Sequence, residues 1–128
     1  MGKYGKAAVR AINLIHKQEI SSPKDAWERA TSELFPDSRS CQKKGCPKGA
    51  FLGLCEEGMI VGVPSGHYTD SYENKSYAVK AVKLLLSDAS LVHNASRLWL
   101  KVLEGEKKEQ NSQMDVVLNL WNQDLIAE

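Results

Sequence analysis

The sequence predicts one all-α, or nearly all-α, domain, folded as a compact bundle of about six helices. Apolar residues recur at three- and four-residue spacing along most of the 128 residues, which is the period of an amphipathic helix. Helix-start residues precede several of these stretches, and only one short segment has the character of a strand. The length fits a single domain covering residues 1–128, and a chain of this size can bury a real core.

The first half of the chain contains three predicted helices. They cover approximately residues 3–17, 22–35 and 47–57. The second begins with Ser22 as N-cap, Pro23 in the first helical position and Asp25 completing a capping box. Gly58 is placed to end the third helix as its C-terminal cap.

A short extended segment follows the third helix. Residues 59–63 are apolar, and Pro64-Ser65-Gly66 predicts a turn, so we consider a short β-hairpin that returns at residues 67–69. A helix followed by such a hairpin suggests a winged helix-turn-helix that contacts nucleic acid. The long connection before the third helix argues against it, as does the acidic Glu56-Glu57 pair at the end of that helix, because carboxylates repel phosphate.

The second half contains three further predicted helices, at about residues 73–87, 89–103 and 112–125. The last is expected to begin with a second capping box, formed by Ser112 and Asp115. Trp27, Trp99 and Trp121 lie on apolar stripes, so we expect all three in the core.

A net charge of +1 hides an uneven distribution. Residues 1–50 carry ten Lys and Arg against five acids, whereas residues 51–128 carry seven against eleven. The basic half favours an anionic partner. The alternative is that the two halves pair within the chain, or that the acidic C-terminal half supports protein interaction or a homodimer.

The basic residues concentrate between positions 39 and 48, where no acid occurs. This segment leads into the start of the third predicted helix, where free amide groups and the helix dipole favour an anion. We therefore predict a non-enzymatic binding module that recognises nucleic acid or a phosphorylated small molecule. A simply solvated loop is the alternative, and no phosphate-loop motif occurs. The predicted anion-binding residues are Arg39, Lys43, Lys44, Lys48 and Gly49.

Two other groups of residues could carry function. His67, Tyr68 and Tyr72 lie in a segment rich in aromatic and hydrogen-bonding groups, which suits a ligand pocket and equally suits capping of the next helix.

The three cysteines, Cys41, Cys46 and Cys55, could bind zinc with His67, although the usual knuckle spacing is absent. Cys46, at a helix start beside lysines, is the candidate nucleophile of a cysteine-dependent enzyme, with His67 or His93 as its base. We predict no catalytic residue, cofactor or metal.

No apolar stretch is long enough to cross a membrane, and the first residues lack the apolar core of a signal peptide. We therefore expect a cytoplasmic protein with no membrane partner and reduced thiols.

Several segments are distinctive as a set, among them KYGKAAV at residues 3–9, CPKGAFLGLCEEG at 46–58 and NSQMDVV at 111–117. Together they resemble a family of small bacterial proteins known only as a domain of unknown function. The resemblance covers the chain from Tyr4 to Ile126 and supports a single domain. It implies no activity and no site residues.

Overall fold

The apolar periodicity of the sequence becomes a bundle of helices in the computed structural model, which describes residues 2–127. Six α-helices have nine or more residues, and two short helical segments join them. In chain order the elements are α1 (Lys3–His16), α2 (Pro23–Leu34), α3 (Arg39–Gln42), α4 (Gly45–Glu56), α5 (Tyr72–Ser87), the 3-10 helix η1 (Ala89–His93), α6 (Ala95–Leu103) and α7 (Gln113–Asn122). The predicted all-α bundle is confirmed.

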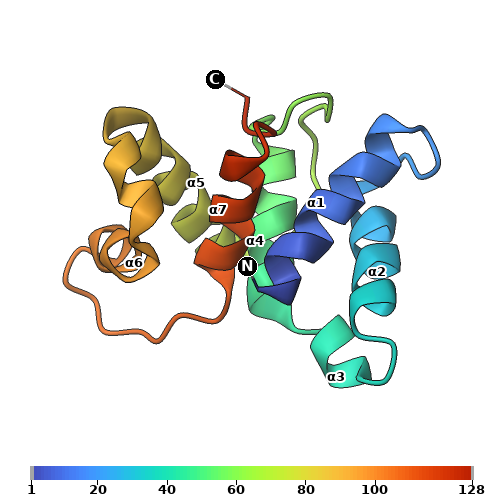
Figure 1. The fold of residues 1–128 in the computed structure, drawn as a ribbon, viewed down its shortest axis with the longest axis horizontal. Helices are drawn as coiled ribbons and strands as arrows, with labels where there is room; N and C mark the ends of the chain where they lie inside the picture. Colours follow the sequence, from blue (N-terminus) through green and yellow to red (C-terminus); the bar gives the residue numbers. More distant parts are fainter. Residues whose placement is uncertain (1, 128) are drawn as a thin grey trace.

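Helix α4 occupies the middle of the molecule (Figure 1). Helices α1 and α2 lie on one side of it, α5 and α6 lie on the other, and α7 packs across α1, α4 and α5. Residues 49–55 of α4 are buried without interruption, as expected of a helix that is apolar all round. A helix enclosed in this way cannot enter a DNA groove, so α4 is not the exposed recognition helix of a winged helix.

Two glycines allow α4 and α5 to approach each other closely. A Cβ atom on Gly49 would lie 2.7 Å from the Ser71 hydroxyl, and one on Gly53 would lie 2.7 Å from the Cα of Lys75. Any larger residue would therefore push the two helices apart. Gly49 and Gly53 are four residues apart, so they lie on the same face of α4.

The β-hairpin that we considered after the third helix does not form in residues 2–127. Ile60 makes an isolated antiparallel bridge to Ile126 instead, and the backbone of residues 66–69 turns back to the end of α4. The amides of Gly66, Tyr68 and Thr69 donate to the carbonyl or carboxylate of Glu56. These amides are therefore not available for a second strand.

Three details of the helix boundaries also differ from prediction. The predicted helix 89–103 is interrupted at Asn94, whose side chain accepts a hydrogen bond from the amide of Arg97 and so starts α6 as a new helix. The long connection before the third predicted helix contains α3, which Ser38 caps. Ser112 forms no capping box, because its left-handed backbone (φ 71°) directs the side chain elsewhere.

The Ser22 N-cap and the helix-ending glycine are confirmed, whereas the reciprocal bond from the Ser22 amide to the Asp25 carboxylate, which would complete the capping box, does not form in residues 2–127. The Ser22 hydroxyl accepts from the amide of Asp25. Gly58 has a φ of 71°, the left-handed conformation that glycine adopts without strain, and the amide of Met59 donates to the carbonyl of Leu54.

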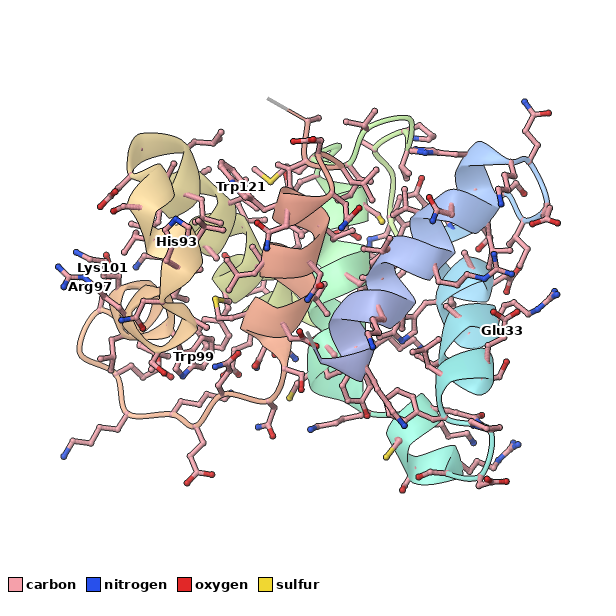
Figure 2. The ribbon with its side chains drawn as sticks, in the orientation of Figure 1. Glu33, His93, Arg97, Trp99, Lys101 and Trp121 are labelled. Atoms are coloured by element: carbon pink, nitrogen blue, oxygen red, sulfur yellow. The ribbon has the colours of Figure 1, made fainter. Side chains whose placement is uncertain are left out.

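Helix α6 shows how the tryptophans are placed. Trp99 is 5% exposed and its indole N–H donates to the carbonyl of Lys108, while Arg97 and Lys101 on the same helix point away from the bundle (Figure 2). Trp27 is fully buried and Trp121 packs partly buried against the core.

No helix within residues 2–127 combines the length and the apolar character needed to cross a membrane.

Candidate anion-binding site

Three of the predicted cations line one hollow beside the start of α4. The hollow has a volume of about 450 Å³, and its walls come from α2, the α3 segment and the first turn of α4. We call it the basic hollow. It is lined by Glu28, Thr31, Arg39, Gln42, Lys43 and Lys48.

The cations of the basic hollow have no carboxylate partner. Within residues 2–127, none of Arg39, Lys43 and Lys48 makes an ion pair, whereas Lys75, Lys80, Lys108, Arg10 and Arg29 each do. Twelve of the seventeen Lys and Arg residues make no ion pair in residues 2–127, so the basic hollow is distinguished by three such cations lining one hollow and not by the missing ion pairs alone. Glu28 is the one acid in the lining and faces three positive charges.

The uncharged polar side chains of the basic hollow, Thr31 and Gln42, donate hydrogen bonds to backbone carbonyls of the chain. The Thr31 hydroxyl donates to the carbonyls of Trp27 and Glu28, and the Gln42 amide donates to the carbonyl of Phe35. Thr31, Gln42 and Glu28 were not predicted from the sequence, because they reach the hollow only through the packing of α2 on α3. Electrostatic attraction in the basic hollow therefore comes from its cations.

The start of α4 is open where it meets these cations. The N-cap residue is Lys44, and no side chain in the described part of the protein accepts a hydrogen bond from the first turn. A Cβ on Gly45 would have nothing within 4 Å. Several other helix starts are closed by side-chain oxygens, including those of Ser22, Asn94 and Asp115, whereas the N-cap residue of α5, Ser71, forms no side-chain cap either. Helix α4 thus keeps the partial positive charge of its N-terminus exposed.

A second hollow, of about 310 Å³, lies on the other side of the same helix start. Lys48 lines both hollows. The second hollow adds the hydroxyl-bearing residues Thr69 and Ser71, and it also contains Cys46. Positive charge and polar groups therefore surround the first turn of α4 on two sides.

Lys44 and Gly49 lie outside the basic hollow. The Lys44 ammonium is 5.5 Å from the centre of the Tyr4 ring, a distance typical of a cation–π contact, and Lys44 is half-buried. Gly49 is buried and lies against Ser71 and Asn74. The structure explains Gly49 by its packing, and Arg39, Lys43 and Lys48 are the predicted residues that come together.

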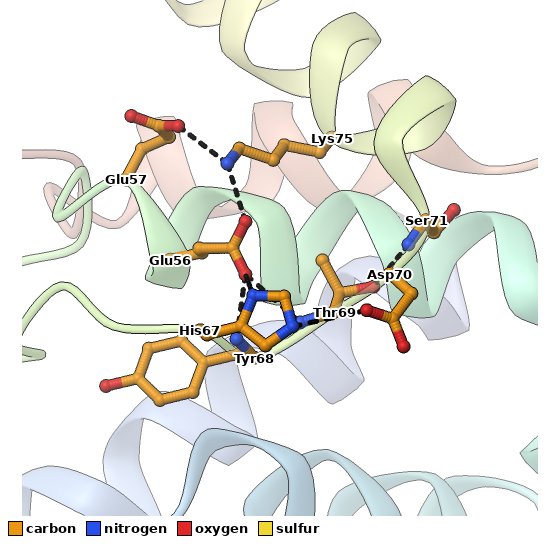
Figure 3. A network of polar contacts seen from close by, with 8 residues as sticks. All are labelled: Glu56, Glu57, His67, Tyr68, Thr69, Asp70, Ser71 and Lys75. Atoms are coloured by element: carbon orange, nitrogen blue, oxygen red, sulfur yellow. Dashed lines mark hydrogen bonds and ion pairs between the residues drawn. The ribbon is translucent and has the colours of Figure 1, made fainter.

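The other end of α4 is closed by a network centred on Glu56 (Figure 3). Its carboxylate accepts hydrogen bonds from Lys75 Nζ (2.5 Å) and from the amides of Tyr68 (2.8 Å) and Thr69 (3.2 Å). The Lys75 ammonium, followed by these amides, lowers the pKa of Glu56 to about 2. Lys75 also contacts Glu57, the residue that follows α4, at 2.7 Å, so both acids at this end are paired within the chain.

His67, Tyr68 and Tyr72 do not share a single pocket. His67 is exposed and lies between Glu56 and Asp70, at 3.4 and 3.2 Å, and the Tyr68 hydroxyl donates to the carbonyl of Pro64. Tyr72 is 80% exposed and lines a separate hollow on α5. His67 and Tyr68 therefore hold the loop to α4.

Cys46 and His67 lie at opposite ends of α4. Cys46 begins α4, while His67 contacts its last turn, and ten residues of helix separate these ends by about 15 Å. The Cys46–His67 dyad, one of the alternatives considered from the sequence, is therefore not formed. Burial raises the pKa of the Cys55 thiol to about 12, which keeps it protonated.

Cys41 is the thiol with a lowered pKa, because Ser38 and Tyr4 stabilise the thiolate. In residues 2–127, no cluster of three or more His, Cys, Asp or Glu side chains is arranged to hold a metal ion.

The fold and this site define a small helical domain with an unmatched basic hollow at the start of its central helix. The chain belongs to the DUF6979 family, described as a family of unknown function, whose model matches residues 1–127. No curated protein and no solved structure shows a significant similarity to the chain.

Proposed function

We propose that this protein is a non-enzymatic binding module that holds a phosphate-bearing ligand in the basic hollow. One observation carries the proposal: Arg39, Lys43 and Lys48 line the same hollow without a carboxylate partner in residues 2–127. Three unmatched cations repel one another. An anion bound between them removes that repulsion and gains charge-assisted hydrogen bonds.

The kinds of cation favour phosphate in particular. Arg39 offers a planar guanidinium that can donate two parallel hydrogen bonds to phosphate oxygens, and the lysines add mobile point charges. The open first turn of α4 contributes the positive end of its dipole, which stabilises an anion within about one turn of the helix.

The shape of the site favours a small phosphorylated compound over nucleic acid. The basic hollow encloses about 450 Å³, within the range of small-molecule pockets. Recognition of single-stranded nucleic acid commonly adds exposed aromatic side chains for base stacking. The most exposed aromatic residue, Tyr72, lies in a different hollow, on α5.

The test is isothermal titration calorimetry with inorganic pyrophosphate, compared with a labelled single-stranded oligonucleotide in fluorescence anisotropy at two salt concentrations. Lys43→Gln and Lys48→Gln should each weaken pyrophosphate binding roughly tenfold, which corresponds to about 1.4 kcal/mol. Lys24→Gln is the matched control, because Lys24 is exposed in the first turn of α2, the end opposite α3. Glu28→Gln should strengthen binding, since it removes the opposing charge from the lining.

Absence of binding to both probes would reject the proposal. So would equal weakening by Lys24→Gln and Lys48→Gln, because the effect would then depend on net charge alone. Tight, salt-dependent binding of the oligonucleotide with no pyrophosphate binding would reject the small ligand in favour of nucleic acid.

A further inference from the structure

A second candidate surface lies on α5, away from the basic hollow and sharing none of its residues. Helix α5 packs against α4 on the side away from α1 and α2 (Figure 1). Its first residue, Tyr72, is 80% exposed, and its next-to-last residue, Leu86, is 49% exposed. They are two of the four large apolar side chains that are exposed in residues 2–127. Helix α5 therefore presents apolar groups to solvent near both of its ends.

These residues belong to one row that runs the length of the helix. Seven residues make almost two full turns, so Tyr72, Val79 and Leu86 lie on the same side of α5. Val79 is half-buried and lines an open hollow of about 400 Å³ together with Tyr72, Ser76 and Lys83. We call these five residues the α5 stripe. Exposed apolar residues are normally scattered singly, whereas a continuous row of them marks an interaction surface.

The charges beside the α5 stripe differ between its two ends. Lys83, towards the C-terminal end, makes no ion pair in the described part of the chain. Towards the N-terminal end, the Lys75 ammonium lies 2.5 Å from the Glu56 carboxylate and 2.7 Å from that of Glu57. Two carboxylates therefore share one ammonium there. One end of the stripe carries an unpaired positive charge, and the other carries an excess of negative charge.

We infer that the α5 stripe is covered by the α5 stripe of a second copy of this chain, with the two helices antiparallel about a twofold axis at Val79. Each residue then meets the residue that lies equally far from Val79 in the opposite direction. Tyr72 packs on Leu86 of the second copy, and Val79 packs on its own counterpart. Lys83 lies beside Lys75 of the second copy, where carboxylates are in excess.

Charge complementarity selects this arrangement. In the antiparallel pair, the unpaired ammonium of Lys83 meets the negative end of the other stripe, and the twofold axis repeats the contact. A parallel pair would place Lys83 beside Lys83 of the second copy, and like charges in contact disfavour a complex. The spacing of the apolar residues agrees, because Tyr72 and Leu86 lie seven residues on either side of Val79.

The size of the α5 stripe predicts a weak and reversible dimer. The stripe covers about 21 Å of helix, and a helix is about 10 Å wide. Two patches of this size are well below the roughly 1,200 Å² of total buried area that stable interfaces reach. We therefore expect a dissociation constant on the order of 10–100 μM.

The test is sedimentation-velocity ultracentrifugation of the 128-residue chain at concentrations from about 5 to 500 μM, a range that brackets this constant. The sedimentation coefficient should rise from that of a monomer to that of a dimer. Tyr72→Ser and Leu86→Ser should each raise the dissociation constant at least roughly tenfold, because each contact occurs twice in the dimer. Leu100→Ser is the matched control, since Leu100 is 67% exposed but lies on α6, and it should change nothing.

A charge exchange tests the antiparallel geometry. Lys83→Glu and Glu57→Lys should each weaken the dimer, and the double variant should restore it, because the exchanged charges meet again across the axis. A variant that merely disturbed the fold would not be rescued in this way. A double variant as weak as the single variants would overturn the antiparallel pairing. A monomer at every concentration would overturn the inference and leave the α5 stripe to a different protein, and equal weakening by Leu100→Ser would overturn it as non-specific association.

Discussion

The two ends of α4 differ in how their unpaired backbone groups are satisfied. Every helix leaves unpaired amides at its start and unpaired carbonyls at its end. At the C-terminal end, the amides of Gly58, Met59 and Gly66 donate to the carbonyls of Cys55, Leu54 and Glu56, and the Glu56 carboxylate is paired with Lys75. At the N-terminal end, no side chain of residues 2–127 caps the helix and three unmatched cations gather beside it. The comparison teaches that contacts within the chain satisfy one end of the helix, whereas the other end leaves its positive electrostatic potential exposed.

The largest expected effect is at the closed end. Glu56→Ala leaves the Lys75 ammonium with the exposed Glu57 alone and removes the acceptor of the Tyr68 and Thr69 amides. We expect the free energy of unfolding to fall by about 2–3 kcal/mol, as when one partner of a partly buried, hydrogen-bonded pair is removed. Urea unfolding measures it. Glu57→Ala is the control and should cost less than half as much, since Glu57 is 45% exposed in its side chain.

The pH dependence of the free energy of unfolding reports the contribution of Glu56 at the same end of α4. The pKa of Glu56 is about 2 in the folded protein, against an ordinary value of 4.5, so the unfolded chain binds this proton more readily. The stabilisation is complete above pH 4.5 and is lost as the pH falls towards 2. Its size is on the order of 2 kcal/mol after allowance for solvent screening.

Glu56→Gln should remove this part of the acid dependence. The difference between the two proteins isolates Glu56 from Glu33 and Glu73, whose pKa values are also lowered by ion pairs. Parallel stability curves for the two proteins between pH 5 and 2 would contradict the role given to Glu56.

The smallest expected effect is at the open end. Lys44→Ser supplies the missing N-cap hydroxyl, which typically contributes about 1 kcal/mol, while it removes the contact with the Tyr4 ring, worth about 0.5 kcal/mol. The net gain in stability should be about 0.5 kcal/mol, and pyrophosphate binding should weaken because the hydroxyl occupies the amides. Thermal unfolding and calorimetry measure the two quantities.

Lys44→Ala is the matched variant, because it removes the same cation without providing a cap. It should lower stability slightly. Equal stability and equal pyrophosphate binding of the serine and alanine variants would show that a side-chain cap at position 44 has no effect. The contrast drawn between the two ends of α4 would then be wrong.

Sequence reasoning found the helices because their apolar spacing is local information. It also found the concentration of cations between residues 39 and 48. It missed the break at Asn94, although an N-cap residue followed by Ala-Ser was a visible signal. The hairpin considered after the third helix does not form, because the amides of Gly66, Tyr68 and Thr69 donate to the carbonyl or carboxylate of Glu56, ten or more positions earlier in the chain.

The candidate sites show the same limit. Nothing local indicates that Thr31 and Glu28 complete the basic hollow, or that Lys44 turns to Tyr4 while Lys43 does not. Likewise, the sequence does not indicate that Asn119 is buried with an Oδ1 atom that accepts no hydrogen bond in residues 2–127, because this follows from the packing of α1 against α7. Charge density can be predicted from a sequence, but the pairing of each charge depends on tertiary packing.

The glycine contact between α4 and α5 has a mechanical consequence. With Gly49 and Gly53 against Ser71 and Lys75, little flexible side chain lies between the two helices at these points, and close-packed interiors are stiff. We therefore expect α4 and α5 to move together as a rigid unit. A displacement of the first turn of α4 would carry the start of α5 with it, and with that the loop whose amides bind Glu56.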